Sequence, residues 1–112
     1  RVAILTSTNT VVARPLSRFF GVDALYGTEL EVVDGCFTGR YAGEYAVGPG
    51  KVAIAAADTA RRGVALDELA YYGDSINDRF ILEAVGEAYA ANPDPALTAL
   101  AERRGWRMLS FR

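Results

Sequence analysis

The fold of this chain is decided at Leu69-Ala70-Tyr71-Tyr72-Gly73-Asp74-Ser75-Ile76-Asn77-Asp78. The first four residues of this stretch have the apolar pattern of a buried strand, and a polar run follows them without a gap. In open parallel sheets, ligands bind beyond the carboxyl ends of the strands. The stretch therefore predicts a central strand with a polar site at its carboxyl end.

On both sides of this stretch, strand and helix patterns alternate. In chain order we predict a strand at 2–5, a helix with Val12, Leu16, Phe19 and Phe20 on one face and Gly21 at its end, strands at 24–26, 30–33 and 36–41, a helix from Lys51 to near Gly63, a helix at 79–85, a strand at 88–91, a helix between Asp94-Pro95 and Gly105, and a strand at 107–111. This alternation predicts an α/β fold with a Rossmann-like, mostly parallel sheet flanked by helices. We see no linker or repeat, so we expect residues 1–112 to form a single domain.

A β-hairpin is expected as an insertion in this alternation. Asp34-Gly35 lies between two strand-like segments, and this dipeptide is the strongest short-range signal for a two-residue turn. Glycine suits the turn because it accepts a positive φ without steric cost.

Composition limits the classes of function. The chain of 112 residues is 51% hydrophobic and 23% charged, which is typical of a globular protein. Its formal net charge is −2 and it has no basic run, so we expect no nucleic-acid partner. No apolar stretch approaches the roughly 20 residues of a membrane span, and Cys36 has no partner for an intramolecular disulfide. We therefore expect a cytoplasmic protein with no membrane partner.

Two features of the residue inventory restrict the chemistry. The chain has no histidine, which excludes a Ser-His-Asp triad and a histidine-rich zinc site within these residues. It also has one lysine, Lys51, against eleven arginines. Any role that needs a compact ammonium group therefore has a single candidate.

The carboxylates of Asp74 and Asp78 are candidate metal ligands. They lie four residues apart beyond the predicted central strand, with Ser75 and Asn77 between them. Mg²⁺ prefers carboxylate oxygens, and it usually takes one or two of them while keeping water and phosphate oxygens. The alternative is that these residues cap the next helix, because Asp and Ser before a helix satisfy its free N–H groups.

Lys51 and the polar run Thr6-Ser7-Thr8 are candidate phosphate-binding groups. Lys51 follows Gly48-Pro49-Gly50 at the start of a predicted helix, where the helix terminus itself attracts anions. The alternative for Lys51 is a solvated surface residue. The hydroxyls of Thr6, Ser7 and Thr8 follow the first strand, and they suit phosphoryl oxygens or, equally, a cap or a turn.

Taken in order, these segments resemble the haloacid dehalogenase superfamily, and within it the phosphoserine-phosphatase-like branch. The resemblance covers nearly the whole chain. It is carried by Ile4-Leu5-Thr6-Ser7, Gly50-Lys51 and Gly73-Asp74-Ser75-Ile76-Asn77-Asp78, with support from Thr28-Glu29-Leu30, Asp34-Gly35-Cys36-Phe37-Thr38-Gly39, Asn92-Pro93-Asp94-Pro95 and Gly105-Trp106.

The resemblance implies a Mg²⁺-dependent phosphatase that acts on a small phosphorylated metabolite. Thr6 matches the hydroxyl residue that binds the transferring phosphoryl group, and Lys51 matches the lysine that neutralises phosphate charge. Asp74 matches the principal magnesium ligand, and Asp78 supports the metal site. Ser7 and Asn77 are the expected substrate-binding residues.

The chain departs from the family pattern in one respect. The family's nucleophile and acid/base aspartates form an Asp-x-Asp motif at the end of a first strand, and no such motif is present here. We therefore expect this chain to be the C-terminal part of the enzyme core, without the nucleophile strand and the cap, and to be inactive alone. The sheet is then completed by an N-terminal half or by a second copy of the chain.

Two other functions remain open at this point. The first alternative is that the chain is a non-catalytic module, which binds phosphate or metal or has a structural role. A doubly wound nucleotide-binding domain is disfavoured, because no G-x-G-x-x-G follows the first strand and no Walker lysine is present.

Overall fold

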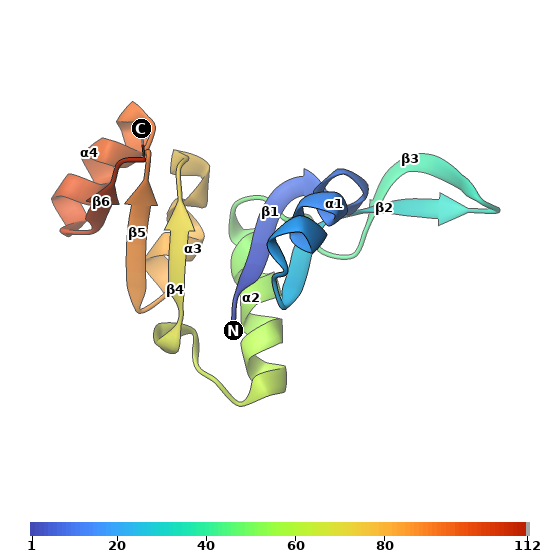
Figure 1. Cartoon of the computed structure of the whole chain (residues 1–112), viewed down its shortest axis with the longest axis horizontal. Coiled ribbons are helices and arrows are strands. Elements are labelled where there is room, and N and C mark those ends of the chain that lie inside the picture. The colour runs from blue at the N-terminus through green and yellow to red at the C-terminus, as the bar shows by residue number, and fades with distance from the viewer. Residues whose placement is uncertain (112) are drawn as a thin grey trace. The chain divides into compact units, whose positions relative to one another are not determined.

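A computed structural model describes residues 1–111. These residues form two compact units, Arg1–Ile54 and a second unit that begins at Ala55. Each unit contains one three-stranded sheet, β1-β2-β3 in the first and β4-β5-β6 in the second (Figure 1). The predicted α/β class with parallel strand pairing is confirmed, and the strands are divided between two sheets. The expected single domain stays a prediction, because it depends on what completes these sheets.

The first unit is built around one long strand. Its elements are β1 (Ala3–Asn9), α1 (Thr10–Phe20), β2 (Ala24–Val33), β3 (Cys36–Ala42) and the first part of α2 (Pro49–Arg62). The first half of β2 pairs in parallel with β1, and its second half pairs antiparallel with β3. We expected two strands, at 24–26 and 30–33, and this was wrong. The strand continues through Gly27, where a Cβ would lie 2.6 Å from the carbonyl oxygen of Thr8 and would block the pairing.

The predicted hairpin and the predicted end of the first helix at Gly21 are confirmed. Asp34 and Gly35 have φ values of 52° and 79°, and Val33 pairs with Cys36 across the turn. Helix α1 begins at the side chain of Asn9, which accepts a bond from the N–H of Val12, and ends at Gly21. The apolar face of α1 is exposed within the structure, and Phe19 is 81% exposed.

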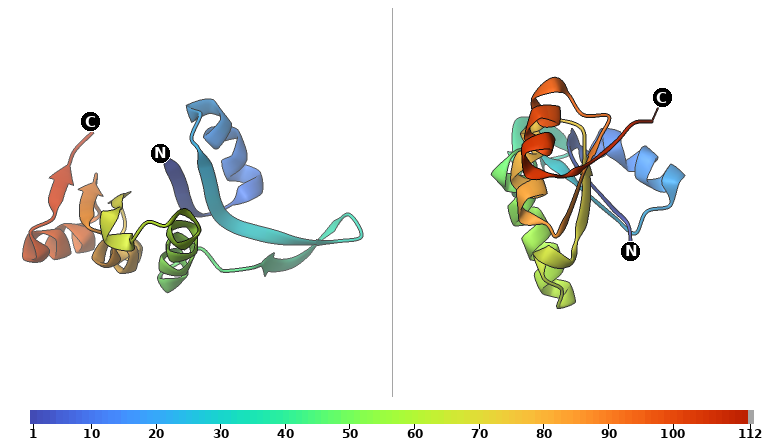
Figure 2. Two further views of the ribbon diagram at one scale, coloured as in Figure 1. Left: turned by 90° about the horizontal axis from the view of Figure 1, so that it is seen from below. Right: turned by 90° about the vertical axis from the view of Figure 1, so that its left-hand side faces the viewer.

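The second unit is a parallel sheet with helices on one face. Its elements are the rest of α2, the short helix η1 (Leu66–Glu68), β4 (Ala70–Gly73), η2 (Ile76–Asp78), α3 (Arg79–Ala84), β5 (Glu87–Ala91), α4 (Pro95–Arg104) and β6 (Arg107–Leu109). Both α3 and α4 lie against the same face of this sheet (Figure 2). The hydrophobic core of this unit, between the sheet and the two helices, consists of Leu82, Ala90, Leu97 and Ala101. The opposite face carries the stacked rings of Tyr72 and Tyr89, with centroids 4.6 Å apart.

Among residues 1–111, no helix is both long and apolar enough to cross a bilayer.

Each sheet has two edge strands, which pair on one side only among the described residues. They are β1 and β3 in the first unit and β4 and β6 in the second. Just before β4, the carbonyl of Leu69 accepts a bond from the N–H of Glu87 at 3.1 Å. Because C=O and N–H point in opposite directions in a trans peptide, the N–H of Ala70 points away from β5 towards the open edge. Such edges favour pairing with another chain.

We therefore expect the isolated 112-residue chain to self-associate, with a mass by light scattering above that of one chain. Ala70→Pro should shift it towards monomer, because proline removes the edge donor and leaves the bonds to β5 intact. Leu69 already has the extended conformation (φ −90°, ψ 151°) that a residue before proline requires. Ala70→Ser is the control that keeps the N–H. A monodisperse monomer of the unmodified chain would contradict this prediction.

Candidate functional site

The loop of residues 73–78 follows β4 and carries both candidate metal ligands. Asp74 is exposed and Asp78 is buried, with 7% of its surface exposed. A Cβ on Gly73 would lie 3.0 Å from the Oδ2 atom of Asp78, so a larger residue there would press against this carboxylate. The sequence of the loop thus brings two carboxylates to the carboxyl end of one strand.

Helix capping does not account for these two carboxylates. The hydroxyl of Ser75 is the cap of η2 and accepts a bond from the N–H of Asn77 at 3.1 Å. Asp78 stands at the N-cap position of α3, and its side chain makes no capping bond there. The capping alternative therefore applies to Ser75 and to neither aspartate.

Magnesium fits this pair as part of a ligand set. Among residues 1–111, no group of three or more His, Cys, Asp or Glu side chains is placed to hold a metal ion. Mg²⁺ usually takes only one or two carboxylates, with water and phosphate oxygens at the remaining positions. Asp74 and Asp78 would supply these carboxylates.

The 73–78 loop is connected to the start of α4 by Asp94. The carboxylate of Asp94 accepts bonds from the N–H of Leu97 at 2.7 Å and from the N–H of Ile76 at 3.0 Å. These two bonds, with a further one from the Ser75 hydroxyl, hold the pKa of Asp94 below its ordinary value. From the sequence, Asp94 was expected only as the N-cap of the last helix, which it is. Its bond to Ile76 spans 18 positions in sequence and has no local signal.

Thr6 and Ser7 lie at an irregular point of β1 in the first unit. The register between β1 and β2 shifts between Leu5 and Asn9. The Thr6 Oγ atom accepts a bond from the N–H of Thr8 at 3.1 Å, and this leaves its own hydroxyl proton to be donated. The Ser7 side chain is exposed. This local geometry suits donation to an anion.

Two residues of β2 fix this irregular segment, and their role was not predicted. The buried hydroxyl of Thr28 donates to the carbonyl of Ser7 at 3.0 Å. The Thr10 hydroxyl donates to the Oε2 atom of Glu29 at 2.9 Å. Thr28 and Glu29 belong to the segment that supported the family resemblance, but nothing in a single sequence shows what they contact.

Lys51 lies in the first turn of α2 and is only 7% exposed. This burial contradicts the alternative of a solvated surface lysine, since lysine is rarely buried without a compensating partner. The residue before it must be glycine, because a Cβ on Gly50 would overlap the carbonyl oxygen of Tyr45. The tight loop before α2 therefore places the single lysine at a buried helix N-terminus.

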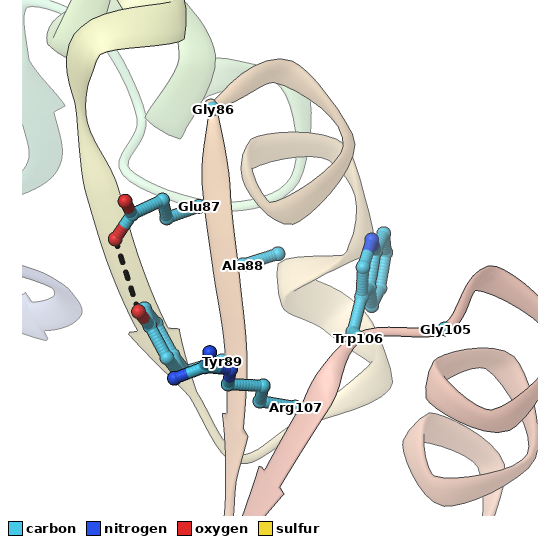
Figure 3. A pocket seen from close by; sticks show the side chains of 7 residues that line it. All are labelled: Gly86, Glu87, Ala88, Tyr89, Gly105, Trp106 and Arg107. Atoms are coloured by element: carbon cyan, nitrogen blue, oxygen red, sulfur yellow. Dashed lines mark hydrogen bonds between the residues drawn. The ribbon is translucent and has the colours of Figure 1, made fainter.

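A separate pocket of the second unit lies near the amino ends of β5 and β6 (Figure 3). The Tyr89 hydroxyl in this pocket donates to Glu87 at 3.0 Å, which is the main reason that the pKa of Tyr89 is raised. The pocket is lined by Gly86, Glu87, Ala88, Tyr89, Gly105, Trp106 and Arg107. None of the predicted site residues lines it, so the pocket is distinct from the 73–78 loop.

Comparison with known proteins identifies the family of this chain. The sequence profile of the haloacid dehalogenase-like hydrolases matches residues 1–83. A phosphoserine phosphatase of Mycobacterium tuberculosis is 40% identical over 112 residues, which are all of this chain and 36% of that protein. A histidinol-phosphatase of Neisseria meningitidis is 35% identical over 97% of this chain and 51% of its own length. The chain thus spans about a third to a half of these relatives.

A solved structure supports the same relationship. A protein of unknown function from Bordetella pertussis is 42% identical and superposes with a TM-score of 0.88. The match covers 96% of this chain and 49% of that one. With the profile match over residues 1–83, these similarities show that the chain belongs to the haloacid dehalogenase-like hydrolase family.

Proposed function

We propose that the complete protein is a cytoplasmic, Mg²⁺-dependent phosphomonoester hydrolase of the phosphoserine-phosphatase type. In this proposal the reaction passes through an aspartyl phosphate, and the nucleophilic aspartate comes from a segment upstream of these 112 residues. The observation that carries the proposal is the burial of Lys51 and Asp78, two charged residues that the sequence resemblance matches to the family's phosphate and metal positions. A buried charge is costly unless a partner or a bound ligand compensates it, and phosphate and Mg²⁺ are ligands that suit these two charges.

In this proposal, each predicted site residue of the chain has a role in binding or charge stabilisation. Lys51 neutralises charge that builds up on the phosphoryl oxygens, and the hydroxyls of Thr6 and Ser7 donate to them. Asn77 orients the substrate. Asp74 and Asp78 hold Mg²⁺, which when bound supplies positive charge for the phosphate. The upstream segment contributes the strand that pairs with the free edges, so the complete protein is a single domain around these residues.

The named substrates of two relatives suggest the substrate class. Phosphoserine and histidinol phosphate are both primary phosphate esters with an amino group on the neighbouring carbon. Relatives that carry these names match nearly the whole chain. We propose that a small 2-aminoalkyl phosphate of this kind is the substrate.

Phosphate release by the complete protein tests this function. We expect hydrolysis of phosphoserine or histidinol phosphate with Mg²⁺, little hydrolysis of glycerol phosphate, which lacks the amino group, and none with EDTA. EDTA-resistant turnover would contradict the metal. A folded complete protein that releases no phosphate from any of these esters would favour the non-catalytic binding module instead.

A further inference from the structure

We propose that Asp94 is a positioning residue that holds the 73–78 loop in the conformation that binds Mg²⁺. This inference rests on the proposed function, because it assigns Asp94 a role in that metal site. Asp94 lies in the second unit with the whole of the loop, so every contact in the argument is internal to that unit.

The carboxylate of Asp94 connects two elements with one oxygen each. Its Oδ1 atom accepts from the N–H of Leu97 and so caps α4. Its Oδ2 atom accepts from the N–H of Ile76 in η2. A helix cap needs only the first of these bonds. The second bond is therefore additional to capping, and it reaches the middle of the segment that separates Asp74 from Asp78.

The backbone of Asp94 makes a further link to the same loop. Its N–H donates to the carbonyl oxygen of Asp74 at 2.9 Å. Two residues of the loop, Asp74 and Ile76, are thus bonded to Asp94.

Such links matter because Mg²⁺ is strict about geometry. It demands nearly ideal octahedral coordination, with oxygens at about 2.0–2.1 Å. Groups that orient the ligands of a metal typically contribute roughly 10- to 100-fold to its affinity. Loss of the bond to Ile76 would let η2 shift, and the carboxylates on either side of Ile76 would shift with it.

Asp94→Ser separates the two roles of this residue. Serine is as good an N-cap as aspartate, so α4 keeps its bond to Leu97. Its single short oxygen cannot also reach Ile76. Thr98→Val is the matched control, because it removes the bond from the Thr98 hydroxyl to the carbonyl of Asp94 at 2.9 Å and does not touch the loop. Each variant removes one side-chain bond at the start of α4, and only Asp94→Ser removes the bond to Ile76, while the backbone bond to Asp74 remains in both.

The readouts are amide hydrogen exchange of residues 73–78 and calorimetric Mg²⁺ binding, both on the complete protein. We expect Asp94→Ser to speed exchange in this segment and to weaken Mg²⁺ binding by about tenfold or more. Phosphatase turnover should recover at high Mg²⁺ concentration. Thr98→Val should leave exchange and Mg²⁺ affinity unchanged.

The outcomes separate this inference from the proposed function. If Asp94→Ser exchanges and binds Mg²⁺ like the unmodified protein, Asp94 is only a helix cap, and the proposed phosphatase activity stands. If Asp94→Ser loses Mg²⁺ affinity in a protein that hydrolyses no phosphate ester, the positioning role stands, and the proposed activity is overturned.

Discussion

Asp74→Asn should abolish the Mg²⁺-dependent phosphatase activity of the complete protein, with a loss of at least about a thousandfold in kcat/KM. The substitution replaces a charged ligand by a neutral amide, and Mg²⁺ depends on carboxylate charge for its affinity. The phosphate charge that builds up in the transition state then has no metal to stabilise it. The readout is phosphate release at saturating Mg²⁺.

The fold should survive this change. The Asp74 side chain is exposed, and the bond between Asp74 and Asp94 uses the Asp74 carbonyl, which asparagine keeps. Circular dichroism should therefore be unaltered. Asp67→Asn is the matched control, because Asp67 is an exposed aspartate of the same unit that lies before β4. Undiminished turnover in Asp74→Asn would refute the metal assignment.

Lys51→Ala should cost the complete enzyme several kcal/mol of transition-state stabilisation, or roughly a hundredfold or more in kcat/KM. The ammonium group is the only lysine charge in the chain and is buried at a helix N-terminus. In a water-poor environment such a charge stabilises a developing phosphoryl charge far better than it does in bulk water. Steady-state kinetics on the substrate that the complete protein hydrolyses give the measurement.

Two further variants separate charge from packing. Lys51→Met keeps most of the apolar stem, so it should fold like the unmodified protein and still lose activity. Arg61→Ala removes a cation from the last turn of the same helix, where the Arg61 side chain is 61% exposed, and should leave activity unchanged. A loss below about tenfold in Lys51→Met, or about 1.4 kcal/mol, would mean that the lysine charge is not used.

Helix and turn boundaries were predictable because single residues determine them. Gly21, Gly63 and Gly105 have positive φ values and end helices where the sequence places them. The turn at Asp34-Gly35 and the start of α4 after Asp94 follow from equally local chemistry. These features depend on the conformation that one side chain allows, and a sequence displays that directly.

Pairing and burial were less predictable because they depend on distant residues. We expected separate strands at 24–26 and 30–33, and one strand runs through both because Gly27 lets the backbone of Thr8 lie against it. The burial of Lys51 has no local signal, and a lysine after a glycine-rich loop is equally consistent with exposure. Asp94 was identified as a cap from the proline after it, while its bond to Ile76 depends on the packing of α4 beside β5.

The β2–β3 hairpin has a practical consequence for experiments on this protein. Cys36 is the only cysteine of the chain; it is exposed and directly follows the two-residue turn. Strand β3 is exposed along its entire length and pairs with the second half of β2, while β1 pairs with the first half. A thiol-reactive fluorophore on Cys36 would therefore sit at a hairpin tip, away from the β1–β2 pairing that holds Thr6. The chain thus carries a native attachment point for labelling, with no engineered cysteine.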